Sequence, residues 1–302
     1  VDSGGNEIYD MYKYEISNGM INRLTKTSQV SETGYRISPE GTQIAIQADP
    51  ETPFRPQIFI YDIKSTTLQK ITKGDMPVYQ PIWSNNGKKI AAISTGDFQY
   101  GELLIVNLNN LKIDTVKPPS NDNLLVPITF SPNDKYVLCY TENEKGFNQL
   151  TLVDIITHEL QSIGSGQWDV LTALWNKNSG IFYTQNVSGR TGIYNMHGPQ
   201  SEVKEVLPPS GFISGLNINE EGTIILFSKQ DGTHPEEICL LDLKTNEIQQ
   251  LTNSLPIDIE STRLSIAEPF KIQSFDSATI EGFLYNPSHQ PSQENYCFLV
   301  FF

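Results

Sequence analysis

The sequence has few of the residues that usually hold metal ions, and it has no long apolar segment. It contains three cysteines and four histidines in 302 residues, the histidines being His158, His197, His234 and His289. None of these histidines has a second histidine or cysteine at zinc-site spacing, so we expect no metal centre. No apolar run approaches the roughly 20 residues that span a bilayer, so we expect no membrane partner.

Positive charge is also scarce. The 21 basic residues stand against 35 acidic ones, which gives a formal net charge of −14. Such a field repels phosphate backbones and anionic lipids, so nucleic acid is not expected as a partner either. The first ten residues lack an initiator Met and both the basic and the apolar region of a signal peptide. Signal cleavage and a cut from a longer chain would both leave such an end.

The three cysteines are odd in number, far apart and placed in apolar, strand-like runs. Cys139, Cys239 and Cys297 are therefore interpreted as small core residues, with a disulfide or a metal site as the alternatives. This usage favours a reducing, cytoplasmic compartment, with the periplasm as the alternative. Asn186 begins a single glycosylation sequon, which chance alone would supply.

Two sub-patterns alternate along the chain, and both predict β-hairpins. In the first, an apolar strand ends in an acid or amide, and a turn and a short strand follow. A short polar side chain there can accept hydrogen bonds from amides two residues on and start the turn. Because the acid or amide recurs, we interpret it as a scaffold element and not as a catalytic group. It returns after 41 to 47 residues, at Glu15, Asp62, Asn107, Asp154, Asn195 and Asp242.

In the second sub-pattern, an apolar anchor residue precedes a tight polar turn and another apolar strand. Pro, Asn-Gly and Glu-Gly supply the turn conformations that hairpins need. Trp83 and Trp175 are predicted to pack between repeats, with ligand stacking as the alternative. The anchors recur after 43 to 47 residues, at Ile37, Trp83, Phe130, Trp175 and Ile218.

Together the sub-patterns give four strands in about 46 residues, the period of a β-propeller blade. No stretch has a sustained 3.6-residue apolar period, so helices should be scarce up to about residue 255. The predicted fold is all-β: a β-propeller over residues 1–256 that begins in mid-blade, with five complete blades and one partial blade. An incomplete ring leaves one blade face bare, so we expect the missing strands to lie upstream.

Beyond residue 256 the period stops. We expect a linker over residues 257–267 and a different domain over residues 268–302. A strand pair should flank the turn at Asp276 and Ser277, and an uncharged apolar strand should run from Tyr296 to Phe302, as in the centre of a sheet.

Three features resemble the prolyl oligopeptidase family of serine peptidases, which join a β-propeller to an α/β-hydrolase domain. The SPEG and SPND turns after Ile37 and Phe130 are shared with TolB-like propellers. Residues 228–243 (SKQDGTHPEEICLLDL) are similar to the family's last blade. Residues 268–287 (EPFKIQSFDSATIEGFLYNP) are similar to the hairpin that enters the hydrolase domain, with Ser277 where the family usually has Gly. The resemblance implies a truncated α/β-hydrolase start over residues 268–302.

The resemblance implies the substrate-gating propeller of a serine peptidase that acts on short peptides. No Gly-x-Ser-x-Gly elbow occurs in the sequence, so the oxyanion loop and the triad are expected beyond Phe302. We therefore name no catalytic, cofactor-binding or metal-binding residue, and whether the chain is itself an enzyme stays open. The alternative is a TolB-like propeller that binds proteins without chemistry. The sequence indicates no oligomeric state.

Four local motifs are interpreted as structural. Asn121–Asn123 lacks the Gly and the Glu of a calcium loop and predicts a turn. Gly164–Gly166 lacks the third Gly of a dinucleotide fingerprint, and it and Gly211–Gly215 are predicted turns without the spacing of a nucleophile elbow. Arg190, in a loop before a strand, is predicted to be solvated, with a place in the active-site cavity as the alternative.

Overall fold

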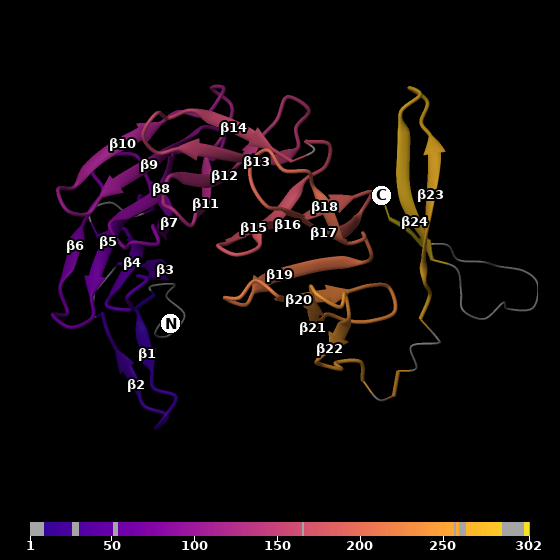
Figure 1. Ribbon diagram of the computed structural model, residues 1–302, viewed down its shortest axis with the longest axis horizontal. Coiled ribbons are helices and arrows are strands. Elements are labelled where there is room, and N and C mark those ends of the chain that lie inside the picture. Colours follow the sequence, from indigo (N-terminus) through magenta and orange to yellow (C-terminus); the bar gives the residue numbers. More distant parts are fainter. Residues whose placement is uncertain are drawn as a thin grey trace, which may run out of the picture. The chain divides into compact units, whose positions relative to one another are not determined.

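The computed structural model describes residues 9–25, 30–50, 54–164, 166–256, 258–259, 264–285 and 299–301. Within these ranges the chain forms strands β1 to β25 and no helix, which confirms the all-β expectation (Figure 1). No part of these ranges is an apolar helix that could cross a membrane. The chain divides into two compact units, residues 1–163 and 164–302, and each is described by itself.

Five four-stranded antiparallel sheets follow one another along the chain, and in each of them consecutive strands are neighbours (Figure 1). We call them blades 1 to 5. Unit 1 contains three blades. Blade 1 consists of β3 (Glu32–Ile37), β4 (Gln43–Ala48), β5 (Gln57–Asp62) and β6 (Leu68–Lys70), and blade 2 consists of β7 (Val78–Trp83), β8 (Lys89–Thr95), β9 (Gly101–Asn107) and β10 (Lys112–Val116). Blade 3 consists of β11 (Val126–Phe130), β12 (Tyr136–Glu142), β13 (Asn148–Asp154) and β14 (Leu160–Ile163). Unit 2 contains blade 4 with β15 (Val170–Asn176), β16 (Gly180–Val187), β17 (Arg190–Met196) and β18 (Lys204–Leu207); and blade 5 with β19 (Phe212–Ile218), β20 (Ile224–Gln230), β21 (Glu237–Asp242) and β22 (Ile248–Gln250).

A two-stranded sheet precedes blade 1. It consists of β1 (Tyr12–Tyr14) and β2 (Ile21–Arg23), which pair antiparallel. Met11, which precedes β1, is buried in one cluster with Phe59 of blade 1. The described strands thus comprise five complete blades and one partial blade, as the phase of the repeat predicts.

The predicted turn caps form at four of the six repeat positions. Oδ1 of Asp62 accepts hydrogen bonds from the amides two and three residues on, at 3.1 and 2.8 Å. Oδ1 of Asn107, Asp154 and Asp242 accepts from the amide two residues on, at 3.0, 2.9 and 2.7 Å. These backbone amides lower the pKa of the three aspartates below its ordinary value. The carboxylates are therefore turn elements, and the structural interpretation is confirmed at these positions.

At the other two positions the prediction of a turn cap is wrong. Asn195 lies inside β17, which continues to Met196, and its Nδ2 donates to the carbonyl oxygens of Ser179 and Ile181, both at 3.0 Å. The side chain of Glu15 forms an ion pair with Lys13 at 2.7 Å. In both cases the polar side chain binds another group in place of the amide two residues on.

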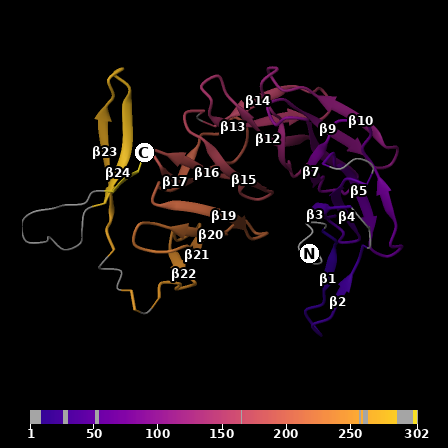
Figure 2. The same cartoon turned by 180° about the vertical axis from the view of Figure 1, so that it is seen from behind.

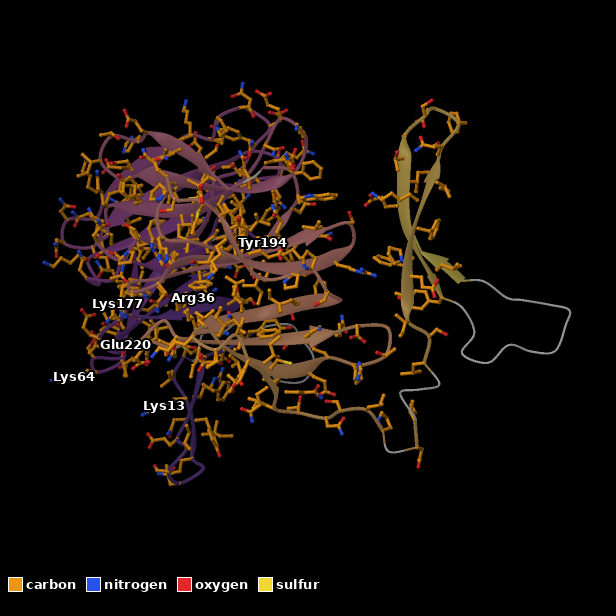
Figure 3. The ribbon with its side chains drawn as sticks, turned by 45° about the vertical axis from the view of Figure 1, so that its right-hand side comes forward. Lys13, Arg36, Lys64, Lys177, Tyr194 and Glu220 are labelled. Carbon is orange, nitrogen blue, oxygen red and sulfur yellow. The ribbon has the colours of Figure 1, made fainter. Side chains whose placement is uncertain are left out.

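The polar residue after each anchor holds the tight turn between the first and second strands of a blade. Oγ of Ser84 accepts the amide of Lys89 at 2.9 Å. The side-chain oxygens of Ser38, Ser131 and Asn219 likewise accept a hydrogen bond from the backbone amide five residues on. In unit 2 the turns of blades 4 and 5 also bind each other, because Lys177 forms an ion pair with Glu220 at 2.7 Å (Figure 3).

Every blade carries a β-bulge in its first strand, and in blades 1, 2, 3 and 5 the register shift ends one residue before the anchor. The register shifts lie between Thr33 and Arg36, Tyr79 and Ile82, Pro127 and Thr129, Val170 and Thr172, and Ser214 and Asn217. Gly34, Gln80 and Gly215 occupy three of the bulges with φ of 62°, 53° and 62°. A bulge bends and twists its strand. The expectation that Gly215 lies in a turn is wrong, because it lies in the bulge of β19.

The core lies between neighbouring blades, because alternate residues of a strand point to opposite faces of a sheet. Ile90 and Leu104 of blade 2 pack with blade 1 in one buried cluster. Their sequence neighbours Ala91 and Leu103 pack with Cys139 of blade 3 in another. Both faces of a central blade are therefore apolar, which explains why its strands lack polar and apolar alternation.

The last described segment is a three-stranded antiparallel sheet of β23 (Ala267–Gln273), β24 (Thr279–Tyr285) and β25 (Leu299–Phe301) (Figures 1 and 2). The hairpin around Asp276 and Ser277 is confirmed, and β23 begins one residue before the predicted domain start at 268. Ser277 has a φ of 67°, a conformation that favours Gly. The predicted strand over 296–302 is described only at β25, and Cys297 lies outside the described residues.

Candidate functional site

Within unit 2, three propeller loops and the C-terminal hairpin line an open cavity of about 540 Å³. Blade 4 contributes the β16–β17 loop, and blade 5 contributes the β20–β21 loop. The link between β18 and β19 joins them, and β24 contributes Phe283 and Tyr285. The cavity thus lies where the C-terminal sheet meets loops of the propeller, and its walls combine aromatic rings with charged groups.

Two glycines of the propeller lie directly against the aromatic residues of β24. A Cβ placed on Gly189 would lie 2.7 Å from Cε2 of Phe283, and one placed on Gly232 would lie 3.1 Å from Cε1 of Tyr285. Real Cβ atoms essentially never approach another atom within 3.0 Å, so a larger residue at Gly189 would push Phe283 away, whereas the contact at Gly232 is tight without being forbidden. The rings of β24 therefore pack against bare backbone in blades 4 and 5.

Arg190 connects the same two elements. Its Nη2 donates to the carbonyl oxygen of Ala267 at 3.3 Å, and its guanidinium carbon lies 5.2 Å from the centroid of the Phe283 ring. The side chain is half-buried. The prediction of a solvated arginine is wrong, because the C-terminal hairpin packs on this loop and sequence spacing does not reveal that contact.

The β20–β21 loop is held at both ends by acidic side chains. Oδ1 of Asp231 accepts hydrogen bonds from the amide and the hydroxyl of Thr233, both at 2.8 Å, and from the amide of His234 at 3.0 Å. Burial raises the pKa of Asp231, but these bonds and the adjacent His234 outweigh it and lower the pKa below its ordinary value. The carboxylate of Glu237 is buried and accepts bonds from Thr252 and Ser254. The loop is therefore preorganised on the cavity wall.

The corresponding loops of unit 1 are hollowed as well. Asp49, Arg55 and Asp75 line a cavity of about 390 Å³ at the β4–β5 loop and the β6–β7 link. Phe98 and Asn123 line another of about 420 Å³ at the β8–β9 loop and the β10–β11 link. Loops between second and third strands, and links between blades, thus form concave surfaces in both units.

The residues considered from the sequence do not converge on one site. Cys139 and Cys239 are buried free thiols whose pKa values are raised by burial, which confirms them as core residues. Trp83 packs against the cluster between blades 1 and 2, and its Nε1 donates to the carbonyl oxygen of Arg36 at 2.8 Å. Trp175 is half-buried.

Other candidates take structural places. Asn121 and Asp122 lie in the predicted turn, and Asn123 binds the backbone of Glu142 through both ends of its amide, at 2.6 and 3.0 Å. Ile37 is 66% exposed, so this anchor does not belong to the core. Across the described ranges, no three His, Cys, Asp or Glu side chains gather as metal ligands. His289 lies outside these ranges.

Comparisons with known proteins show likeness in structure only. No protein-family model and no curated protein sequence matches the chain. A puromycin-hydrolysing peptidase of Mycobacterium tuberculosis covers 93% of this chain at 13% identity with a TM-score of 0.76, and the match spans 48% of that protein. A prolyl endopeptidase covers 94% at 15% identity with a TM-score of 0.56, over 51% of its own length.

TolB from Acinetobacter baumannii also matches. It covers 82% of this chain at 14% identity with a TM-score of 0.57, over 60% of its own length. The chain thus spans about half the length of the peptidases and somewhat more of TolB. At these identities the likeness establishes the fold: the chain has the β-propeller architecture that is found in TolB and in prolyl oligopeptidase-type peptidases.

Proposed function

We propose that the chain is the propeller portion of a serine peptidase of the prolyl oligopeptidase type, where it controls the access of short peptides to the catalytic site. Residues 1–256 form the propeller, residues 257–267 connect it, and residues 268–302 begin the hydrolase domain. The observation that carries the proposal is that Phe283 of β24 packs against Gly189 and Arg190 of blade 4. A hydrolase domain that continues from β24 would begin on the loop surface of the propeller.

The comparisons support this assignment in one respect. The two peptidases cover 93% and 94% of the chain, whereas TolB covers 82%. A sheet such as β23–β25 should have a counterpart in a peptidase but not in a protein that consists of blades and an unrelated domain. The peptidases accordingly match a larger share of this chain than TolB does.

The physical basis of gating is the rigidity of the blades. Each pair of adjacent blades within a unit buries an apolar cluster, so separating two such blades would expose apolar surface to water. An extended peptide can pass a constriction that a folded protein cannot. The sequence contains no Gly-x-Ser-x-Gly elbow, so these residues act by selecting the substrate and not by attacking it.

A fluorophosphonate probe and a peptide series test the proposal together. The probe should leave this 302-residue chain unlabelled and should label one serine of the whole protein. The whole protein should cleave fluorogenic peptides of a few residues and leave a folded protein that contains the same cleavage sequence intact. Labelling of the isolated chain, or equal cleavage of the folded protein, would contradict the proposal.

A TolB-like binding propeller is the second candidate, and the likeness to TolB favours it. The same labelling experiment separates the two functions. A binding propeller would give a whole protein that the probe does not label and that cleaves none of the peptides.

A further inference from the structure

The cavity at β24 presents groups of opposite charge beside apolar walls. Its volume of about 540 Å³ is within the range of about 300–1,000 Å³ that small-molecule sites occupy. Arg190 and Asp231 line it, and so do Phe212 and Phe283. Phe212 is 47% exposed, so part of an aromatic side chain is accessible at the cavity. An apolar ligand group would remove this surface from water.

Arg190 has hydrogen-bonding capacity that its own chain does not use. A guanidinium carries five N–H donors. Among the described residues it makes one hydrogen bond, to the carbonyl oxygen of Ala267 at 3.3 Å, while Phe283 lies against it at 5.2 Å from the ring centroid. These two contacts hold the group against the C-terminal hairpin and leave donors for a planar acceptor with two oxygens. A carboxylate is the ligand group that matches this geometry.

Asp231 is the acidic group that lines the same cavity. Its Oδ1 is engaged by Thr233 and His234, whereas Oδ2 accepts no hydrogen bond from the described residues. A free carboxylate oxygen repels a second carboxylate and accepts N–H donors. A ligand with one carboxylate would therefore place it at Arg190, and would place an N–H toward Asp231.

We propose that this cavity binds a small N-acyl or peptidyl amino acid with an apolar side chain. The carboxylate binds Arg190, the side chain packs on Phe212 and Phe283, and the backbone N–H faces Asp231. The inference concerns binding only and does not rest on the proposed peptidase function. In this inference, Arg190 and Asp231 together recognise the free carboxyl end of the ligand.

Isothermal titration of the 302-residue chain with N-acetylphenylalanine tests the inference, and N-acetylphenylalanine amide is the matched ligand control. The acid should bind at least about tenfold more tightly than the amide, because it alone forms the charge-assisted bonds. Arg190→Gln should weaken binding of the acid by about tenfold or more. Arg36→Gln, which removes the same charge from an exposed arginine of blade 1, should leave the affinity unchanged.

Asp231→Asn, unlike Arg190→Gln, should not weaken binding of the acid. Asparagine retains the oxygen that caps the loop and removes the negative charge, so the acid should bind as tightly as before or up to about tenfold more tightly. Equal affinity for acid and amide, or no saturable binding of either below about 10 mM, would overturn the inference. Should Arg190→Gln unfold the chain, the comparison of acid and amide on the unmodified chain still decides. The fluorophosphonate experiment is unaffected by either result.

Discussion

Asn85 donates both its backbone amide and its side-chain Nδ2 to the same oxygen of Asp134, at 2.7 and 2.8 Å. Oδ2 of the same carboxylate accepts the amide of Asn86 at 2.9 Å. The two turns lie in blades 2 and 3 and are separated by 49 residues. One carboxylate thus binds the first turn of one blade to that of the next, at a position where the repeat always places a turn.

Asp134→Ala should lower the stability of the chain by about 1–2 kcal/mol, because it removes three hydrogen bonds to a charged acceptor at an exposed site. The φ of Asp134 is 55°, which alanine tolerates poorly, whereas asparagine adopts it readily. Asp134→Asn is therefore the control and should cost less than half as much. Urea unfolding measures both, and equal losses in the two variants would contradict a contribution from the oxygen and the backbone conformation that asparagine retains.

A buried threonine holds the outer strand of blade 1. Oγ1 of Thr72 accepts the amide of Ile58 at 2.9 Å and donates to Oε1 of Gln57 at 2.8 Å. Thr72 is fully buried. Thr72→Val keeps the shape and leaves both partners unsatisfied, so it should cost about 2 kcal/mol. Thr72→Ser keeps the hydroxyl and both hydrogen bonds, so it should cost clearly less. Thermal unfolding of both variants tests the difference, and equal shifts would contradict it.

The repeat and its hairpins could be predicted from the sequence because they rest on local chemistry. Asp62 and Asp242 cap turns formed by their own neighbours, so the sequence alone indicates them. The buried Cys139 was predicted by the apolar residues around it. Asn195 shows where local reasoning fails, because its partners Ile181 in β16 and Ser179 just before β16 lie 14 and 16 residues away.

The candidate site could not be predicted in the same way. Arg190 and Ala267 are 77 residues apart, and nothing in the loop around Arg190 indicates which strand will pack on it. The sequence contained one indirect signal, the adjacent Gly189, whose lack of a side chain permits the approach of Phe283. A glycine before an arginine is too common a pattern to reveal that contact.

The bulge of blade 2 carries a glutamine where blades 1 and 5 have glycine. Gln80 has a φ of 53°, and its amide donates to Oε1 of Gln47 at 2.6 Å, a bond that glycine would keep. Gln80→Gly should stabilise the chain by about 0.5 kcal/mol, since relief of the left-handed strain exceeds the entropy cost. Gln69→Gly, in the exposed strand β6, should instead destabilise by about 0.5–1 kcal/mol. If the two variants shifted the unfolding temperature in the same direction, the interpretation that Gln80 is strained would be contradicted.

The turn caps predict an acid-sensitive fold. Backbone hydrogen bonds lower the folded-state pKa of Asp62, Asp154 and Asp242. A lowered folded pKa means that the contribution to stability is present above the unfolded pKa of about 3.9 and is lost as the pH falls through the folded value. The triple Asp→Asn variant keeps the capping oxygens, so its free energy of unfolding should fall less steeply between about pH 5 and pH 2. Urea titrations across that range measure the slope, and parallel slopes would show that the carboxylates are not linked to folding.

The packing of β24 on blade 4 can be tested at Gly189. A Cβ there would lie 2.7 Å from Phe283, and the φ of 75° is itself unfavourable for alanine. Gly189→Ala should therefore loosen the hairpin and speed hydrogen exchange at the amides of β23 and β24, while blades 1 to 3 stay protected.

A double-mutant cycle with Phe283→Ala separates the clash from the backbone strain. The strain at Gly189 is present with either side chain at position 283, whereas the clash requires the ring. Gly189→Ala should thus cost less in the Phe283→Ala background, by about 1 kcal/mol or more in the free energy of unfolding. Additive costs would mean that the ring does not rest on the glycine. The structural basis of the proposed junction would then be lost, because Phe283 is also the ring over which Arg190 lies.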